Sequence, residues 1–319
     1  MTKEISTLTP FAEDVMEGLM SENKHLPSKY FYDAKGDSLF QQIMHLDEYY
    51  LTRKELEIFE THKAAILEAI NGDNEPLRII ELGAGDGLKT KVLLKYFLSQ
   101  GVDFIYTPVD ISGNVLEILE QNLTAEIPGL KIETYEGDYF DALKGISERP
   151  EKDIVFFLGS NVGNFSREEA EKFLSDLQKF LKAGDLLFMG VDLKKDPAII
   201  LNAYNDSQGV TREFNLNLLD RINTEMGANF DRDQFLHYPY YNPHTGECRS
   251  YLISKSEQEI TFEEESVVLR AWEAIFMEIS KKYDRKQLEQ LAKASGFCPV
   301  QSFLDSDNWF ADVLWQKEK

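Results

Sequence analysis

Arg78-Ile-Ile-Glu-Leu-Gly-Ala-Gly-Asp-Gly-Leu-Lys89 is the stretch of sequence that decides the fold. Residues 78–82, with apolar Ile79, Ile80 and Leu82, have the pattern of a buried strand, and residues 89–99 carry apolar side chains at helical spacing. Gly83 and Gly85 let the backbone turn sharply and approach a ligand without a clash from a Cβ atom. The N–H groups at the start of the helix point toward the same place. The stretch therefore predicts a ligand-binding loop between a strand and a helix.

The chain beyond this loop continues to alternate strand and helix patterns. We expect further strands at residues 104–111, 131–135, 153–158 and 186–193. A helix is expected at residues 115–123, and Ser166 with Glu169 forms a capping box that begins the next helix. After residue 284, a helix and two short strands near 300–304 and 310–315 could complete the sheet. This succession predicts an α/β fold, a Rossmann-like doubly wound and mostly parallel sheet with helices on both faces.

The two flanks of this alternation have a different character. Residues 1–70 have mainly helical patterns, and residues 208–270 contain a helical segment, an aromatic stretch and a hairpin arm. We therefore expect a nucleotide-fold core at residues 60–207 plus 271–319. A smaller substrate-recognition lobe is expected at residues 1–59 plus 208–270. Ligands of such sheets bind outside the carboxyl ends of the strands.

The spacing of the glycines indicates which nucleotide the loop binds. The dinucleotide fingerprint requires glycine at position 88, which is leucine here, and this argues against a nicotinamide-dependent oxidoreductase. The spacing G-x-G-x-G, with Glu81 two residues before the first glycine, is typical of class I methyltransferases, which bind S-adenosylmethionine. Asp110 at the end of the next strand can accept hydrogen bonds from ribose hydroxyls. Asp138 and Tyr139 after the third strand can contact the adenine.

Composition and charge exclude several classes of partner. The net charge of -22 disfavours binding to nucleic acid or to anionic membrane surfaces. No apolar run reaches the roughly 18 residues of a membrane-spanning helix. Cys248 and Cys298 are the two cysteines, which suggests no disulfide framework and favours the cytoplasm. The five histidines form no cluster that would bind zinc. We expect a monomer that acts on a small molecule.

Several segments outside the loop together resemble the histidine Nα-methyltransferases of ergothioneine biosynthesis. They are residues 30–40, 48–53, 157–165, 190–197, 203–206, 214–219 and 278–283. They occur in order from about residue 27 to the C-terminus, so the resemblance covers nearly the whole chain. The wider family includes fungal enzymes that methylate the amino nitrogen of tryptophan-derived substrates. The resemblance implies a methyltransferase core with a substrate-recognition lobe.

The resemblance also implies a role for individual residues. The catalytic residues would be Tyr49, Asn164 and Tyr204, of which the last two hold the amino-acid head group near the backbone of Gly159. The aromatic side chains of Tyr32 and Phe40 would lie close to the substrate ring beside Tyr49. Glu278 and Ser280 would hydrogen-bond the imidazole. The cofactor contacts would be Gly83, Lys89, Asp110, Asp138 and Tyr139, and the loop pattern itself adds Glu81 and Gly85.

These roles agree with the chemistry that the residues offer. An imidazole has one N–H donor and one nitrogen acceptor. Glu278 can accept a hydrogen bond from the N–H, and Ser280 can donate one to the other nitrogen. Their spacing on a strand places both side chains on one face. The predicted activity is transfer of methyl groups to the α-amino group of histidine, giving N,N,N-trimethylhistidine (hercynine).

Three alternatives remain open from the sequence. The same reaction could act on another amine, such as tryptophan or tyrosine. The protein could be a nicotinamide-dependent oxidoreductase or a non-catalytic protein that binds the methyl donor. One departure from the family bears on the first alternative: Ser250 stands where the family often places an apolar side chain against the substrate ring.

Overall fold

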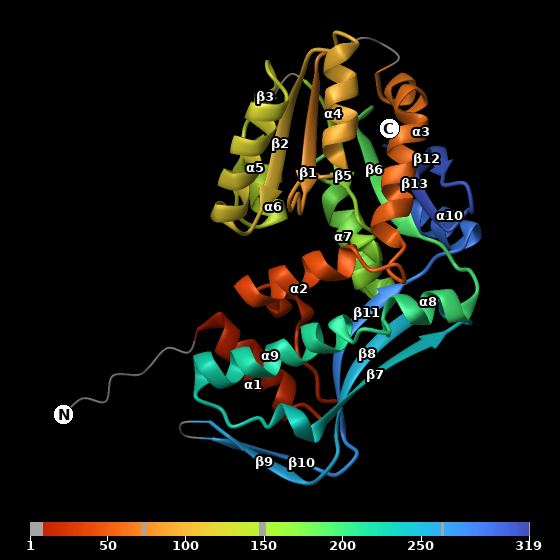
Figure 1. The fold of residues 1–319 in the computed structure, drawn as a ribbon. Coiled ribbons are helices and arrows are strands. Elements are labelled where there is room, and N and C mark those ends of the chain that lie inside the picture. Colours follow the sequence, from red (N-terminus) through yellow and green to blue (C-terminus); the bar gives the residue numbers. More distant parts are fainter. Residues whose placement is uncertain (1–8, 72–74, 147–150, 263–264, 319) are drawn as a thin grey trace, which may run out of the picture. The chain divides into compact units, whose positions relative to one another are not determined.

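The computed structural model describes residues 9–71, 75–146, 151–262 and 265–318 of the chain. The chain divides into two compact units (Figure 1), which we describe separately. The small-sheet unit is Met1–Tyr50 with Lys195–Ser280, and the large-sheet unit is Leu51–Lys194 with Lys281–Lys319. The bounds differ from those expected, because the helix Leu51–Asn71 packs against the large sheet and the helix Pro197–Ala203 packs against the small one.

The large-sheet unit is built on one mixed sheet, in which the described strands follow the order β12-β13-β6-β5-β1-β2-β3, with β4 also paired to β2. Parallel pairs join β1 (Leu77–Leu82), β2 (Phe104–Asp110), β5 (Lys152–Phe157), β6 (Leu186–Asp192) and the short β3 (Lys131–Ile132) and β4 (Tyr135–Glu136). The C-terminal strands β12 (Phe297–Leu304) and β13 (Phe310–Lys317) are antiparallel, and β13 pairs with β6. The expected doubly wound sheet is thus confirmed.

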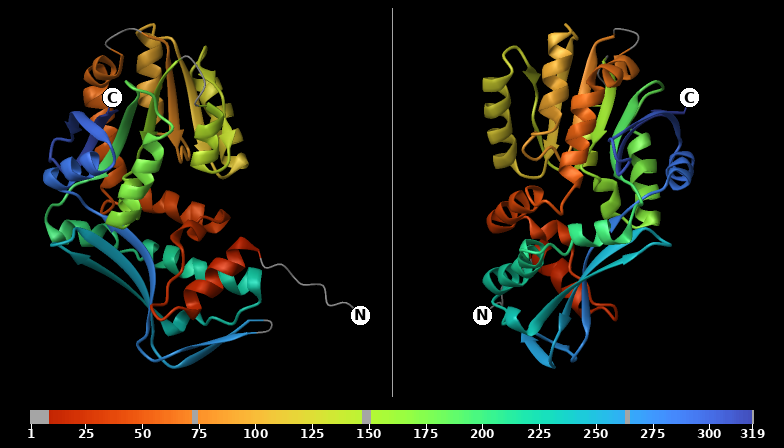
Figure 2. Two further views of the ribbon diagram at one scale, coloured as in Figure 1. Left: turned by 180° about the vertical axis from the view of Figure 1, so that it is seen from behind. Right: turned by 45° about the vertical axis from the view of Figure 1, so that its right-hand side comes forward.

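Helices lie against both faces of this sheet (Figure 2). One face forms a hydrophobic core with α6 (Tyr139–Ile146), α7 (Arg167–Gln178) and α10 (Arg285–Ala294). The remaining helices of this unit are α3 (Leu51–Asn71), which packs on α4 (Thr90–Ser99), and α5 (Gly113–Glu126), which packs on β2. The predicted capping box at Ser166 and Glu169 is present at the start of α7.

Two expectations about this sheet need correction. The strand expected at 131–135 is two short strands that pair with β2 in one register, because Pro108 of β2 has no N–H to donate in the gap between them. The two C-terminal strands are longer than expected and antiparallel, and β13 lies inside the sheet between β6 and β12. Central strands such as β1 and β6 are buried along their whole length, as strands covered on both faces should be.

The small-sheet unit contains a three-stranded antiparallel sheet in the order β11-β8-β7. Its strands are β7 (Phe235–Asn242), β8 (Glu247–Ser254) and β11 (Ala274–Lys281), and a separate hairpin joins β9 (Gln258–Thr261) to β10 (Ser266–Leu269). Its helices are α1 (Pro10–Met20), α2 (Ala34–Met44), α8 (Pro197–Ala203) and α9 (Val210–Met226), with the short 3₁₀ turns η1 (Ser28–Phe31) and η3 (Arg232–Gln234). Phe214, Leu218, Leu252 and Met277 help to form its hydrophobic core.

The topology of the large sheet fixes where a ligand can bind. Because β1 pairs with β2 on one side and with β5 on the other, the chain order reverses at β1. Ligands of doubly wound sheets bind outside the carboxyl ends of the strands at such a switch point. We therefore expect a ligand to bind at the loops after β1 and β5. Among the described residues, no helix is long and apolar enough to cross a membrane.

Candidate active site

The loop after β1 adopts a backbone that favours glycine. Gly83, Gly85 and Gly87 have φ angles of 72°, 54° and 63°, in the left-handed region. A Cβ atom on Gly83 would lie 2.8 Å from the Tyr139 hydroxyl oxygen, whereas a Cβ on Gly85 would meet no atom within 4 Å. A ligand can therefore approach the backbone at Gly85 closely.

Polar groups from the next two strands of the sheet border this loop. Asp110 ends β2, and one of its carboxylate oxygens accepts a hydrogen bond from the Gly85 N–H at 3.4 Å. Asp138 is exposed just before α6. Burial, together with the charges of Asp110 and Asp138, raises the pKa of Tyr139 to about 12, so its phenol stays protonated. These three side chains supply acceptors and one donor beside the loop.

Glu81 lies beneath the loop rather than at its surface. It is buried, and its two oxygens accept hydrogen bonds from the Thr90 hydroxyl at 2.6 Å and the Tyr106 hydroxyl at 2.5 Å. Burial raises the pKa of Glu81 to about 7. The sequence suggested Glu81 as a cofactor contact; in the structure its observed partners join β1, β2 and α4 to one another.

Lys89 forms an ion pair with Glu55, a fully buried carboxylate on α3. The other oxygen of Glu55 accepts a hydrogen bond from the N–H of Gly159 at 2.7 Å. Sequence reasoning missed Glu55. The sequence could have indicated it, because Glu55 lies in the apolar stripe of α3 with Leu51 and Ile58. A carboxylate buried at such a position must be paired.

The turn after β5 brings further polar groups to the same edge of the sheet. Gly159 and Ser160 have φ angles of 74° and 59°, and the 3₁₀ turn η2 (Asn161–Asn164) follows. Asn164 is exposed. The Asn161 amide nitrogen would lie 3.6 Å from a Cβ on Gly83, so Asn161 borders the glycine loop. Asn161 was not singled out from the sequence, although it lies within a segment that carries the family resemblance.

The small-sheet unit contains a chain of aromatic rings. The ring of Tyr49 lies 6.4 Å from the rings of both Tyr204 and Phe40, measured between centroids. Phe40 in turn lies 5.6 Å from Tyr32 and 5.9 Å from Phe214. The structure thus brings together all four aromatic residues that the sequence assigned to the substrate.

Two residues of β11 complete the predicted set in this unit. The hydroxyl groups of Ser280 and Tyr204 are 2.7 Å apart and share a hydrogen bond, and both residues are buried. Glu278 is half-buried on the same strand, two positions before Ser280. The two positions share one face of a regular strand, as the spacing predicted.

Ser250 takes part in a buried polar chain. Its hydroxyl donates to the Asn215 side-chain oxygen at 2.8 Å, and His237 Nε2 lies 2.9 Å from the same hydroxyl. Because Ser250 gives its proton to Asn215, His237 Nε2 carries the hydrogen and donates to Ser250. The serine that departs from the family pattern therefore fixes β7, β8 and α9 to one another.

His237 should make the stability of the protein sensitive to acid. Burial lowers the pKa of His237 to about 4, below the 6.5 of an ordinary histidine. Its contribution to the free energy of unfolding is therefore present above pH 6.5 and is lost as the pH falls toward 4, by about 3 kcal/mol in total. Denaturant titrations at a series of pH values should show that the free energy of unfolding of His237→Gln falls less between pH 6.5 and 4 than that of the wild type. The exposed His244→Gln is the matched control, and equal slopes in all three proteins would contradict the assignment.

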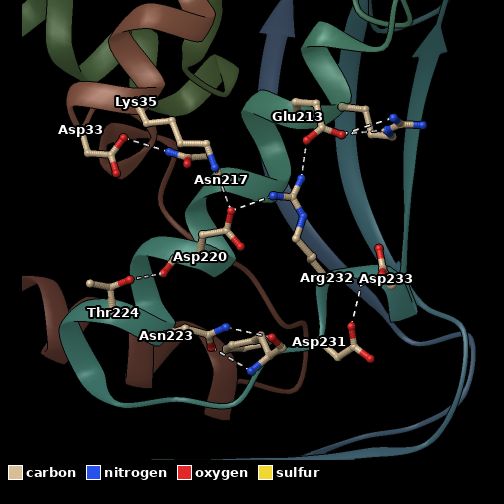
Figure 3. A network of polar contacts seen from close by, with 12 residues as sticks. Asp33, Lys35, Glu213, Asn217, Asp220, Asn223, Thr224, Asp231, Arg232 and Asp233 are labelled. Atoms are coloured by element: carbon tan, nitrogen blue, oxygen red, sulfur yellow. Dashed lines mark hydrogen bonds and ion pairs between the residues drawn. The ribbon is translucent and has the colours of Figure 1, made fainter.

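A polar network in the small-sheet unit supports the segment that carries Tyr32 and Phe40 (Figure 3). Asp33 caps α2 by accepting from the N–H of Gly36 at 2.6 Å, and it also accepts from the Asn217 amide at 2.8 Å. A Cβ on Gly36 would lie 1.8 Å from the Phe31 carbonyl oxygen, so only glycine fits there. Nearby, Asp220 on α9 pairs with Lys35 at 3.0 Å and with Arg232 at 2.7 Å.

The predicted site residues fall into two sets. The large-sheet unit holds Glu81, Gly83, Gly85, Lys89, Asp110, Asp138, Tyr139, Gly159 and Asn164, all at or near the carboxyl ends of its strands. The small-sheet unit holds Tyr32, Phe40, Tyr49, Tyr204, Glu278 and Ser280. The first set contains the residues predicted to contact the donor, together with Gly159 and Asn164, which were predicted to hold the amino-acid head group. The second contains the other residues predicted to contact the substrate.

The doubly wound sheet with a glycine loop at its switch point defines a class I, S-adenosylmethionine-dependent methyltransferase. Residues 11–317 match the model of a family described as histidine-specific, S-adenosylmethionine-dependent methyltransferases. The chain belongs to this family.

Known relatives match along almost the whole chain. The histidine N-alpha-methyltransferase of Mycolicibacterium smegmatis is 34% identical over 302 residues, which is 94% of this chain and 90% of the relative. That of Mycobacterium tuberculosis is 33% identical over 306 residues, or 95% of this chain and 94% of the relative. Ergothioneine biosynthesis protein 1 of Neurospora crassa is 31% identical over 301 residues, or 91% of this chain and 33% of that longer protein.

Proposed function

We propose that this protein transfers methyl groups from S-adenosylmethionine to the α-amino nitrogen of L-histidine, ending at N,N,N-trimethylhistidine. The observation that carries the proposal is the match of residues 11–317 to a histidine-specific methyltransferase family. The aromatic, hydroxyl and carboxylate groups expected for histidine recognition lie in one unit, which supports it further.

The residues of the large-sheet unit fit the methyl donor. The positive φ angles and the absence of any atom near a Cβ on Gly85 allow close approach to the loop backbone. We assign Gly83, Gly85 and Lys89 to the methionine end, Asp110 to the ribose, and Asp138 with Tyr139 to the adenine. When bound, the donor supplies an electrophilic methyl group on a sulfonium. Glu81 holds the strands beneath the loop in place.

The small-sheet unit offers complementary groups for histidine. Glu278 can accept from the imidazole N–H and Ser280 can donate to the other ring nitrogen, with Tyr204 orienting the Ser280 hydroxyl at 2.7 Å. Tyr32, Phe40 and Tyr49 can contact the ring through their aromatic faces. We assign Asn164, with the Gly159 backbone, and Tyr204 to the amino-acid head group.

The chain contributes position rather than covalent chemistry. An amine attacks only through its lone pair, so the α-ammonium group must lose a proton before each transfer. Hydroxyl and amide groups such as those of Tyr49 and Asn164 can orient the resulting amine toward the methyl group. Orientation of two bound reactants lowers the barrier by replacing an encounter in solution.

We further infer that the protein acts in the cytoplasm as a monomer. Cys248 and Cys298 are both free thiols in the structure, and the inference about the compartment rests on this low cysteine content. The small-molecule substrate needs no protein partner for its recognition.

The direct test is a methyl-transfer assay with purified protein, S-adenosylmethionine and histidine. Mass spectrometry should show products heavier by one to three methyl groups, carried on the α-nitrogen and not on the ring. The absence of any mass gain on histidine, from a protein that binds the donor, would contradict the proposed substrate.

A further inference from the structure

A buried carboxylate connects the two loops that border the donor site. Glu55 is fully buried on α3, in the large-sheet unit. One of its oxygens pairs with the Lys89 ammonium at the end of the glycine loop, and the other accepts from the Gly159 N–H at 2.7 Å. A single side chain therefore holds a group from the loop after β1 and a group from the turn after β5.

The backbone of β6 passes close to this carboxylate at Gly190. A Cβ atom on Gly190 would lie 2.1 Å from Glu55 Oε1, so β6 can pass the carboxylate only with glycine at this position. Gly159 has a φ of 74°, and a Cβ there would lie 3.5 Å from Lys89 Nζ. Gly190 of β6 thus makes room for the Glu55 carboxylate, and Gly159, in the turn after β5, brings its backbone beside the ion pair.

A second acid, Asp312, lies close enough to the pair to interact with both of its charges. Asp312 on β13 is fully buried, and neither of its carboxyl oxygens has a hydrogen-bond partner among the described residues. Burial, and then the charge of Glu55, raise the pKa of Asp312 well above its ordinary range. This direction favours the neutral form of Asp312, and the ion pair that Lys89 forms in the structure is with Glu55.

We propose that Glu55 is a positioning residue, which holds the Lys89 ammonium and the Gly159 amide in the arrangement that binds the methyl donor. This inference rests on the proposed function, because it takes the donor to be S-adenosylmethionine. A lysine ammonium that donates one N–H to Glu55 has its other two N–H groups directed away from that carboxylate. The lysine is then arranged for the ligand before binding, and less ordering is required when the ligand arrives.

Substitutions of Glu55 and Lys89 test whether the two act together. Glu55→Gln keeps an acceptor for the Gly159 N–H but cannot balance the lysine charge, and Lys89→Met removes the ammonium. Each variant should raise the Kd of S-adenosylhomocysteine, measured by calorimetry, by about tenfold or more. If Glu55 acts through Lys89, the double variant should bind within about twofold of Lys89→Met.

The controls separate the possible failures. Glu60→Gln makes the same chemical change at an exposed position of α3 and should leave the Kd unchanged. If the Kd of the double variant is raised about a hundredfold, the two effects are independent and the positioning role is overturned. It is also overturned if the Kd of Glu55→Gln is raised by less than about threefold. A wild-type protein that binds no donor product would instead contradict the proposed function.

A measurement on the unsubstituted protein covers the case in which Glu55→Gln does not fold. The Gly159 N–H donates to the buried Glu55 carboxylate, so its hydrogen exchange should be slowed about a hundredfold or more relative to an unstructured peptide. Exchange at the unprotected rate in the free protein would show that Glu55 does not hold this amide, and would overturn the proposal whether or not the donor binds.

Discussion

Replacing Glu278 with alanine should raise the KM for histidine about 10- to 100-fold, while the Kd of the methyl donor stays within about twofold. Glu278 is half-buried on β11, two positions from Ser280, whose hydroxyl shares a hydrogen bond with Tyr204. A carboxylate that accepts from the imidazole N–H makes a charge-assisted hydrogen bond, which is stronger than one between neutral groups. Its removal should therefore weaken histidine binding without affecting the donor loop in the other unit.

Steady-state kinetics and donor calorimetry on the same preparations check this prediction. Glu278→Gln should lie between the wild type and the alanine variant, because the amide oxygen still accepts but carries no charge. Glu259→Gln, an exposed glutamate of the same unit, is the matched control and should behave as wild type. Equal losses in histidine and donor binding would show that Glu278 supports the fold rather than the imidazole.

Gly83→Ala should abolish measurable donor binding. Gly83 has a φ of 72°, which costs about 1–2 kcal/mol for a residue with a Cβ atom. The added Cβ would also lie 2.8 Å from the Tyr139 hydroxyl oxygen, so the tyrosine ring must move. Because Tyr139 is itself assigned to the adenine, both the loop backbone and this contact should be displaced. Calorimetry with S-adenosylhomocysteine should detect a loss of at least about a hundredfold in affinity.

Two further variants separate the clash from the backbone strain. Tyr139→Phe removes the hydroxyl that the new Cβ meets, so Gly83→Ala with Tyr139→Phe should bind the donor better than Gly83→Ala alone. Gly101→Ala introduces a Cβ at a φ of 76° with no atom within 4 Å, and should lose stability but keep turnover. If Gly83→Ala binds the donor as tightly as Gly101→Ala does, the close approach at Gly83 has no part in binding.

Local sequence signals predicted the parts of the fold that depend on local physics. The strand before Gly83, the helix after it and the capping box at Ser166 follow from apolar periodicity and from side chains that bond nearby backbone groups. The aromatic and hydroxyl residues of the small-sheet unit were assigned through the family resemblance, and the structure places them within contact of one another.

The features that were missed depend on contacts between distant parts of the chain. Glu55 meets the Gly159 N–H across 104 positions in sequence, and no local pattern predicts such a partner. The position of β13 between β6 and β12 is likewise set by pairing over a long separation. Ser250 looked like a change in a substrate pocket, yet its hydroxyl is bonded to Asn215 and His237, which only the folded chain brings near it.

The measurement that tests the central claim most directly is the methyl-transfer assay run over a panel of amino acids at equal concentrations. The panel should include histidine, tryptophan, tyrosine and an aliphatic amino acid, with kcat/KM determined for each by mass spectrometry. We predict that histidine has the highest kcat/KM and that its product carries up to three methyl groups on the α-nitrogen. A higher kcat/KM for tryptophan or tyrosine than for histidine would contradict the assignment of Glu278 and Ser280 to an imidazole, and with it the proposed function.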